Sequence, residues 1–214
     1  VDPRQAKAAR AQFKPRLVGF GPRVAASGAC FCDGRGALID PPAARNAAAV
    51  AFAQTNAKRV AGVATHDVMI PAGDRELPVR IYRAAAVEGP RPGVLFFHQG
   101  GFVIGDLDTC DSFCSRLAAD LGAVVVSVDY RMGPEHRFPA ALDDASDAWV
   151  WLNDSAAALG VDASKLVVCG DSAGGQLSAA LCQSLRFPGG TQPALQVLVY
   201  PWVDATAEGG SMES

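Results

Sequence analysis

The clearest sign of chemistry in this sequence is a serine set between small residues, in the run Gly170-Asp171-Ser172-Ala173-Gly174. The run follows a strand-like segment, 165–170, and precedes a predicted helix that extends to about Leu185. A serine on such a tight turn projects its hydroxyl at a helix N-terminus, whose dipole favours developing negative charge. The pattern alone is weak, because an ordinary strand–helix turn has a similar composition. Its place between a buried strand and a helix favours a nucleophilic serine.

A second turn, His98-Gln99-Gly100-Gly101, follows the strand-like segment 93–97. Acyl transfer needs backbone N–H donors held where negative charge develops on the substrate oxygen, and small residues let the backbone approach closely. Standing alone, this turn would be read as a glycine-rich strand ending. The carboxyl ends of parallel strands meet at one edge of a sheet, where α/β proteins place their sites. The two turns together predict one site for nucleophilic acyl transfer.

The segments around these turns alternate between strands and helices. Two strand-like runs, 65–70 and 77–83, are joined by Pro71-Ala72-Gly73-Asp74 and predict a hairpin. Continuous Val and Leu runs that alternate with helices are typical of a mostly parallel sheet covered on both faces, so the predicted fold class is α/β. Buried-type strands are expected at 93–97, 123–128, 165–170 and 194–200, and helices are expected to begin near Asp108 to Asp111, at Pro139 and at Ser172.

The first sixty residues read as helices and loops rather than strands. Asp2-Pro3 and Asp40-Pro41 each suit a helix start, and the glycine-rich segment 27–36 suits a loop. The expected division is therefore a helical region at 1–60 and an α/β core at 61–214.

Composition excludes several function classes. The chain has 214 residues, 50% of them hydrophobic, and net charge −3 without a long basic run, so neither nucleic acid nor an anionic membrane is an expected partner. No apolar stretch approaches the ~18 residues of a membrane span, and the first residues carry no apolar signal-peptide core. None of the cysteines forms a CxxC pair, so we expect reduced, packing cysteines, no metal site and a cytoplasmic location. The six cysteines stand at 30, 32, 110, 114, 169 and 182.

From about Gly93 to Asp204 the chain resembles the hormone-sensitive-lipase-like group of α/β-hydrolases. HQGGFVIGDLD looks like the HGGG segment of that family, and GDSAGG at 170–175 looks like its nucleophile turn. SVDYRMGPEHRFPAALDDA at 127–145 looks like its signature connection, and YPWVD at 200–204 looks like the end of its sixth strand. The resemblance implies an α/β-hydrolase fold with an N-terminal helical cap segment and no cofactor.

The resemblance also implies the roles of particular residues. Ser172 corresponds to the nucleophile, and the backbone N–H groups of Gly100, Gly101 and Ala173 correspond to the donors of the oxyanion hole. Gln99 departs from the family pattern, which has a glycine there. It either narrows or polarises the acyl pocket, bonds to the cap, or has a purely structural role.

The acid and base of a catalytic triad are not evident. For this fold the chain order is serine, then acid, then histidine, yet His66, His98 and His136 all precede Ser172. By the resemblance, His98 braces the oxyanion segment, and His136 belongs to the signature connection. His66 is expected at the surface. Of the two acids that follow the serine, Asp204 and Glu208, the former matches a structural position at the end of the sixth strand.

We therefore expect a C-terminal segment of the same protein, roughly one hundred residues by family resemblance, to supply the acid and base as a second chain or an unbuilt part. The last strands of the fold are expected to be missing from this chain, which would leave 194–200 as an apolar edge strand.

Other polar residues are expected to be structural. Asp143 and Asp144 open a helix, where acidic side chains favour the dipole. Arg131, Glu135 and Arg137 are expected to form a polar brace for the connection.

The leading hypothesis is a serine carboxylic-ester hydrolase that forms an acyl-enzyme on short to medium acyl esters. This chain alone is expected to be nearly inactive. The alternatives are a non-catalytic homologue that binds a small molecule, or an inactive truncated fragment. A small-molecule ester is the expected ligand, and a homodimer is left open.

Overall fold

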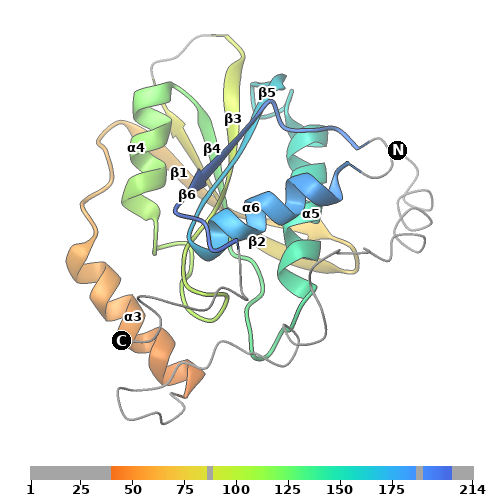
Figure 1. Cartoon of the computed structure of the whole chain (residues 1–214). Coiled ribbons are helices and arrows are strands. Elements are labelled where there is room, and N and C mark those ends of the chain that lie inside the picture. The colour runs from red at the N-terminus through yellow and green to blue at the C-terminus, as the bar shows by residue number, and fades with distance from the viewer. Residues whose placement is uncertain (1–39, 86–88, 187–189, 204–214) are drawn as a thin grey trace.

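The computed structural model describes residues 40–85, 89–186 and 190–203. These residues form one six-stranded sheet with the strand order β1-β2-β4-β3-β5-β6 (Figure 1). The strands are β1 (Val63–Ala72), β2 (Arg75–Ala84), β3 (Arg91–Phe97), β4 (Val124–Val128), β5 (Val161–Asp171) and β6 (Leu195–Val199). The helices are α3 (Pro41–Thr55), α4 (Asp111–Leu121), α5 (Ala140–Ser155) and α6 (Ala173–Ser184).

The sheet is mostly parallel, as the alternation of strands and helices predicts. β4, β3, β5 and β6 pair in parallel, whereas the hairpin β1–β2 joins the sheet through an antiparallel pairing of β2 with β4. α4 covers one face of the sheet, and α5 and α6 cover the other (Figure 1). The expected α/β class is confirmed.

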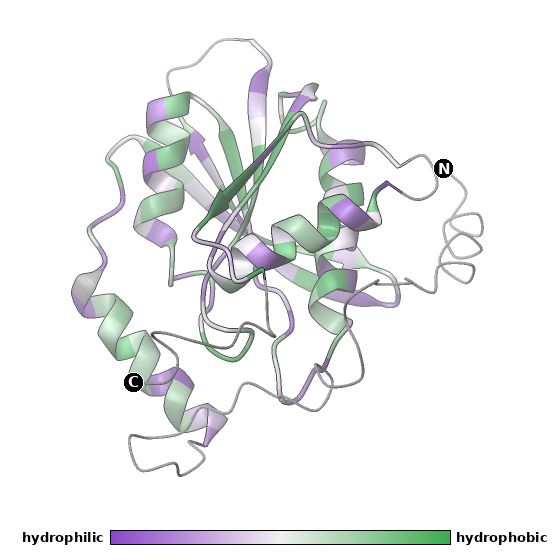
Figure 2. Ribbon diagram, viewed as in Figure 1, coloured by the Kyte–Doolittle hydropathy of each residue, from purple (hydrophilic) through white to green (hydrophobic). Residues whose placement is uncertain are grey.

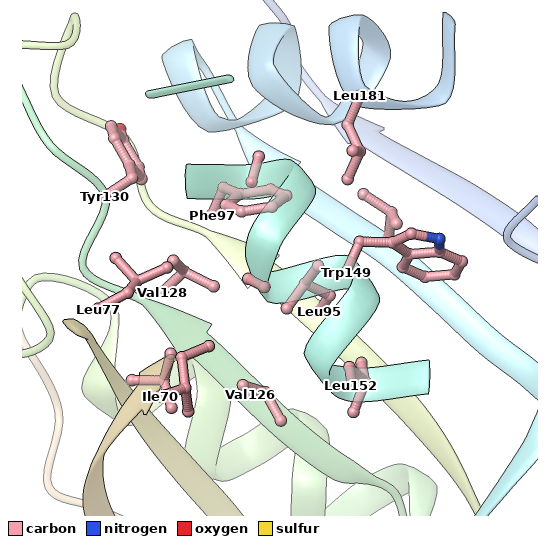
Figure 3. Packing of buried hydrophobic residues seen from close by; sticks show 14 of the residues in the cluster. Ile70, Leu77, Leu95, Phe97, Val126, Val128, Tyr130, Trp149, Leu152 and Leu181 are labelled. Atoms are coloured by element: carbon pink, nitrogen blue, oxygen red, sulfur yellow. The ribbon is translucent and has the colours of Figure 1, made fainter. Parts of the chain in front are cut away.

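Burial on both faces explains why the central strands are apolar throughout. Along β3, Leu95 and Phe97 point toward α5 and α6, whereas Val94 and Phe96 point toward α4. Figure 2 shows hydrophobic residues concentrated on the strands at the centre of the molecule. In the larger of the two hydrophobic clusters, on the face covered by α5 and α6, Trp149 of α5 packs with Leu95 and other residues of the sheet (Figure 3).

The hairpin turn is tighter than expected. Pro71 and Ala72 belong to β1 and pair with Glu76 and Arg75, so only Gly73 and Asp74 form the turn. Proline is tolerated here because β1 is an edge strand of the described sheet.

The helix start at Asp40-Pro41 is confirmed. Asp40 is the N-cap of α3, and its Oδ2 accepts a hydrogen bond from the backbone N–H of Ala43 at 3.3 Å. The other expected helix start, Asp2-Pro3, and the loop at 27–36 lie outside the described residues. Within the described residues, no helix is both long and apolar enough to cross a membrane.

Asp144 acts differently from the expected helix-start acid. It is fully buried and forms ion pairs with Arg75 of β2 and with Arg131, whose guanidinium lies 2.8 Å away. Its Oδ2 also accepts from the backbone N–H of Arg131 at 2.7 Å. Asp144 therefore ties the start of β2, the connection after β4 and α5 together, whereas its neighbour Asp143 is exposed.

Asp144→Asn is expected to lower the free energy of unfolding by about 3 kcal/mol, because it leaves two arginines facing a buried neutral side chain. Asp143→Asn, one residue away and exposed, is the matched control and should change stability by less than about 0.5 kcal/mol. Urea unfolding of both variants measures the difference. Equal effects of the two substitutions would contradict the assigned role of Asp144.

Candidate functional site

Ser172 lies on a strained turn between β5 and α6. Its backbone angles are φ 51° and ψ −114°, a combination that residues other than glycine rarely adopt. The turn is held on both sides, because Ser172 N donates to Val199 O at 3.0 Å and Ser172 O accepts from Gln176 N at 3.0 Å. The strained backbone conformation of this turn therefore sets the orientation of Ser172.

Gly174 brings this turn against the end of β3. A Cβ atom at Gly174 would overlap the carbonyl oxygen of Phe97 and would lie 2.8 Å from that of His98. Only glycine allows the first turn of α6 to approach the β3 strand so closely. Phe97 and Gly170 are also direct neighbours in the parallel pairing of β3 with β5. The two predicted turns therefore leave the same edge of the sheet side by side.

The turn after β3 folds back on itself. Gly100 has φ +133°, and its carbonyl oxygen accepts from both Val103 N and Ile104 N at 3.0 Å. A side chain at Gly100 would overlap the backbone of Ile104. Gly101, with φ +59°, continues the turn. The backbone of Gly100 and Gly101, which carries no side chains, therefore lies next to the serine turn. The assignment of Gly100, Gly101 and Ala173 as oxyanion donors stays a prediction.

His98 is part of the support for this turn. It is fully buried and stacks on Tyr130 with ring centroids 4.4 Å apart. Its Nδ1 is hydrogen-bonded to Gln99 O at 2.7 Å, and the Tyr130 hydroxyl donates to His98 O at 2.7 Å. Burial lowers the pKa of His98, so the ring is held neutral. The other two histidines, His66 and His136, are exposed on β1 and in the connection after β4.

Two pockets open at this edge of the sheet. The first, about 250 Å³, lies between α3 and the loops after β3 and β4. The second, about 180 Å³, lies beside the serine turn. The lining of the first comprises Arg45, Ala49, Phe52, Gly105, Asp106, Thr109, Asp129 and Met132. The lining of the second comprises Asn56, Gln99, Thr109, Cys110, Phe113, Asp171, Val199 and Tyr200.

Helix α3 is anchored over this edge by its two ends (Figure 1). Arg45 donates to Val103 O and to Gly133 O, each at 2.8 Å, and pairs with Glu135 at 2.6 Å. At the other end, the Asn56 amide donates to the carbonyls of Asp108 and Thr109. Residues of α3 line the first pocket, and its C-cap residue Asn56 lines the second.

Two of the three residues expected to brace the connection, Arg131 and Glu135, form ion pairs that hold it, whereas Arg137 forms none with the described residues. Arg131 binds Asp144, Glu135 binds Arg45, and Arg137 is exposed. The connection is braced by residues far away in the sequence, which local spacing does not reveal.

A buried arginine holds the loop between the two pockets. Arg80 of β2 pairs with Asp67, Asp108 and Asp111, with distances of 2.5 to 2.9 Å. The Tyr82 hydroxyl also donates to Asp111 at 2.9 Å. This cluster, absent from the sequence-based prediction, fixes the segment that carries Thr109 and the start of α4.

The cysteines near the site are packing residues, as expected. Cys110, Cys114 and Cys169 are free and buried. Burial raises the pKa of Cys110 to about 12 and that of Cys169 to about 11, so both thiols stay protonated at neutral pH. Cys30 and Cys32 lie outside the described residues.

Asp171, next to Ser172, is a buried carboxyl group. Its burial raises its pKa, and the Tyr200 hydroxyl donates to its Oδ2 at 3.4 Å. The Cys110 thiol donates to its Oδ1 at 3.9 Å. Asp171 thus links the serine turn to the residue that follows β6 and to the start of α4.

The strain at Ser172 predicts an unusual order of stabilities. Because a positive φ costs a non-glycine residue about 1–3 kcal/mol, Ser172→Gly should be more stable than Ser172→Ala by roughly 1 kcal/mol. At Ser178, within α6, the order should reverse, since glycine in a helix costs about 1 kcal/mol relative to alanine. Urea unfolding of the four variants provides the test, and the same order at both positions would argue against strain at the turn.

Asp129, in the first pocket, predicts a pH dependence of stability. Burial, reinforced by Asp106 and Asp108 and opposed by Arg80, raises the pKa of Asp129 to about 6. An acid whose pKa is raised on folding binds its proton more tightly in the folded state. Its ionisation therefore lowers stability as pH rises from about 4 to about 6.

Asp129→Asn is therefore expected to be more stable than the unchanged protein at pH 7.5, by on the order of 2 kcal/mol. Below about pH 3 the two proteins should unfold at the same urea concentration, because Asp129 is then protonated in both states. A stability difference independent of pH would show that packing, not ionisation, is responsible.

Comparison with known proteins supports the resemblance drawn from the motifs. The model of the alpha/beta hydrolase fold family matches residues 94–214. The chain is 45% identical over 140 residues to an ethyl acetate hydrolase of Pseudomonas putida, covering 64% of this chain and 44% of that protein. It is 44% identical over 151 residues to the carboxylic ester hydrolase LipN of Mycobacterium tuberculosis, covering 68% of this chain and 40% of that protein.

Solved structures agree. An ester hydrolase from the metagenome of Lake Arreo, in complex with a derivative of bipyridine phosphonate, superposes with a TM-score of 0.76 at 37% identity. This match covers 80% of this chain and 55% of that one. An esterase of Pyrobaculum calidifontis gives a TM-score of 0.73 at 40% identity, with 80% and 56% covered. The chain thus spans about half the length of these relatives, and the family match over residues 94–214 shows that it belongs to the α/β-hydrolase family.

Proposed function

We propose that the protein of which this chain is part is a serine carboxylic-ester hydrolase. The observation that carries the proposal is the strained turn at Ser172 packed through Gly174 against the glycine turn after β3. A nucleophile and a bare backbone at one sheet edge are what acyl transfer requires. The relatives named as ester hydrolases support the same reaction.

In the proposed reaction, the Ser172 hydroxyl oxygen attacks the ester carbonyl carbon while a base takes its proton. The negative charge that develops on the carbonyl oxygen is stabilised by the backbone N–H groups of Gly100, Gly101 and Ala173. Collapse of this intermediate releases the alcohol, which takes the proton from the base. Water then attacks the acyl-enzyme in the same way, releases the carboxylic acid and restores Ser172.

The base and its orienting acid come, in this proposal, from a C-terminal segment beyond this sequence. The three histidines of this chain support this. His98 is hydrogen-bonded to Gln99 O in the turn after β3, and His66 and His136 are exposed. The edge of the described sheet supports it too, since Leu195 and Val197 of β6 are 56% and 37% exposed. An apolar edge strand is usually covered by another element, and a further strand in the C-terminal segment would cover it. The N-terminal region 1–60, which contains α3, is proposed to serve as the cap.

The proposed substrates are esters with short to medium acyl chains. The pockets, about 250 and 180 Å³, suit small substituents. The name of one relative, an ethyl acetate hydrolase, points the same way. No cofactor enters the proposed reaction.

Labelling with a fluorophosphonate, which reacts with activated serines, tests the proposal. The protein extended at its C-terminus to the length of its relatives should be labelled at Ser172, and Ser172→Ala should abolish labelling. The present chain alone should react slower by a factor of ~10⁴ or more, because loss of triad members costs about that much. Ser184→Ala, at the far end of α6, is the control that should label normally.

Labelling at another residue would reject Ser172 as the nucleophile, and no labelling of the extended protein would reject the hydrolase proposal in favour of a non-catalytic homologue. Full reactivity of the 214-residue chain alone would reject the need for a C-terminal segment.

A further inference from the structure

The second pocket, of about 180 Å³, is distinguished by one polar side chain with no evident task. It abuts the serine turn, because its lining includes Asp171 and includes Val199, whose carbonyl oxygen accepts from Ser172 N. Gln99 lines it from the turn after β3. A substituent of a substrate held at Ser172 would therefore pass close to Gln99.

The backbone of Gln99 is locked in place. Its carbonyl oxygen is hydrogen-bonded to Nδ1 of the buried His98 at 2.7 Å, and the carbonyl oxygen of the next residue, Gly100, accepts from Val103 N and Ile104 N at 3.0 Å. The residue cannot leave the pocket wall without breaking contacts that also shape the predicted oxyanion turn. The backbone position from which the Gln99 side chain reaches this pocket is therefore fixed.

The other polar groups of the lining are already engaged within the protein. The Asn56 amide donates to two backbone carbonyls, and the Thr109 hydroxyl is bonded to Asp106. The Tyr200 hydroxyl and the Cys110 thiol both face Asp171. These contacts leave little hydrogen-bonding capacity for a ligand.

Gln99 differs from these groups. Its side-chain amide forms no hydrogen bond with any of the described residues. An amide offers both a donor and an acceptor, so it recognises a hydroxyl or a carbonyl oxygen equally well. Asp171, an acid in the same wall, disfavours a negatively charged substituent.

We propose that Gln99 determines specificity by binding, through its amide, an uncharged oxygen on the ester substituent that occupies this pocket. The substrate class is then a short ester whose one arm carries a hydroxyl or carbonyl group. Phe113 and Val199 supply the apolar wall for its carbon atoms. The space, about 180 Å³ or roughly six water molecules, limits this arm to a few atoms. This inference rests on the proposed function, since it presupposes an ester held at Ser172.

The test measures binding rather than turnover, in a Ser172→Ala background of the C-terminally extended protein. Two ligand pairs differ only by a hydroxyl in place of a methyl group. Ethyl 3-hydroxybutanoate with ethyl 3-methylbutanoate probes the acyl arm. 2-Hydroxypropyl acetate with isobutyl acetate probes the alcohol arm. Dissociation constants are obtained by NMR titration, in which the side-chain amide signal of Gln99 is a direct reporter.

The hydroxyl member of at least one pair should bind more tightly and shift the Gln99 amide signal. Gln99→Met, similar in length but without the amide, should shift the ratio of dissociation constants of that pair toward the methyl member by about tenfold. Gln183→Met, on the exposed end of α6, is the matched control and should leave the ratio unchanged.

The proposal is overturned if Gln99→Met leaves both ratios unchanged, or if neither hydroxyl ester binds. Failure of the proposed function has a different signature, because it removes fluorophosphonate labelling of Ser172 while the binding ratios are measured without turnover. The urea unfolding midpoint of Gln99→Met is measured as a control. A midpoint equal to that of the parent protein shows that the change in the ratio of dissociation constants reports recognition rather than folding.

Discussion

The contact on which the candidate site depends lies where the first turn of α6 meets the end of β3. Gly174 rests against the carbonyl oxygens of Phe97 and His98, at a separation that no side chain permits. This contact holds the serine turn beside the glycine turn and fixes the distance between them. It exists because β3 and β5 are parallel neighbours, in register from Gly93 with Leu166 to Phe97 with Gly170.

Around that contact, ion pairs and hydrogen bonds of charged side chains hold the neighbouring loops and helices in position. Asp144 joins β2, α5 and the connection that carries Tyr130, which in turn supports His98 from above its ring. Arg80 holds the loop that lines both pockets, and Arg45 holds the covering helix α3. Each arginine satisfies several oxygens at once, which suits its planar, multiply donating head group. The polar network lies outside the apolar core and orients the loops over it.

Local patterns in the sequence were sufficient for the elements and for the two turns. Strands such as β4 are runs of valine, and helix boundaries such as Asp40-Pro41 carry their own capping chemistry. The positioning network was not predictable, because its partners are far apart in the sequence: Arg45 and Glu135 are 90 residues apart, and Arg75 and Asp144 are 69 apart. Such pairs arise from the packed fold, and spacing along the chain contains no sign of them. The pockets, formed by the same long-range packing, were equally hidden.

The central claim is that the turns at Ser172 and at Gly100-Gly101 form one catalytic site. A crystal structure of the C-terminally extended protein with a phosphonate bound covalently to Ser172 tests it most directly. The account predicts that one phosphonyl oxygen lies about 2.7–3.1 Å from the backbone nitrogens of Gly100, Gly101 and Ala173. A phosphonate on Ser172 whose oxygens all point away from these nitrogens would contradict it.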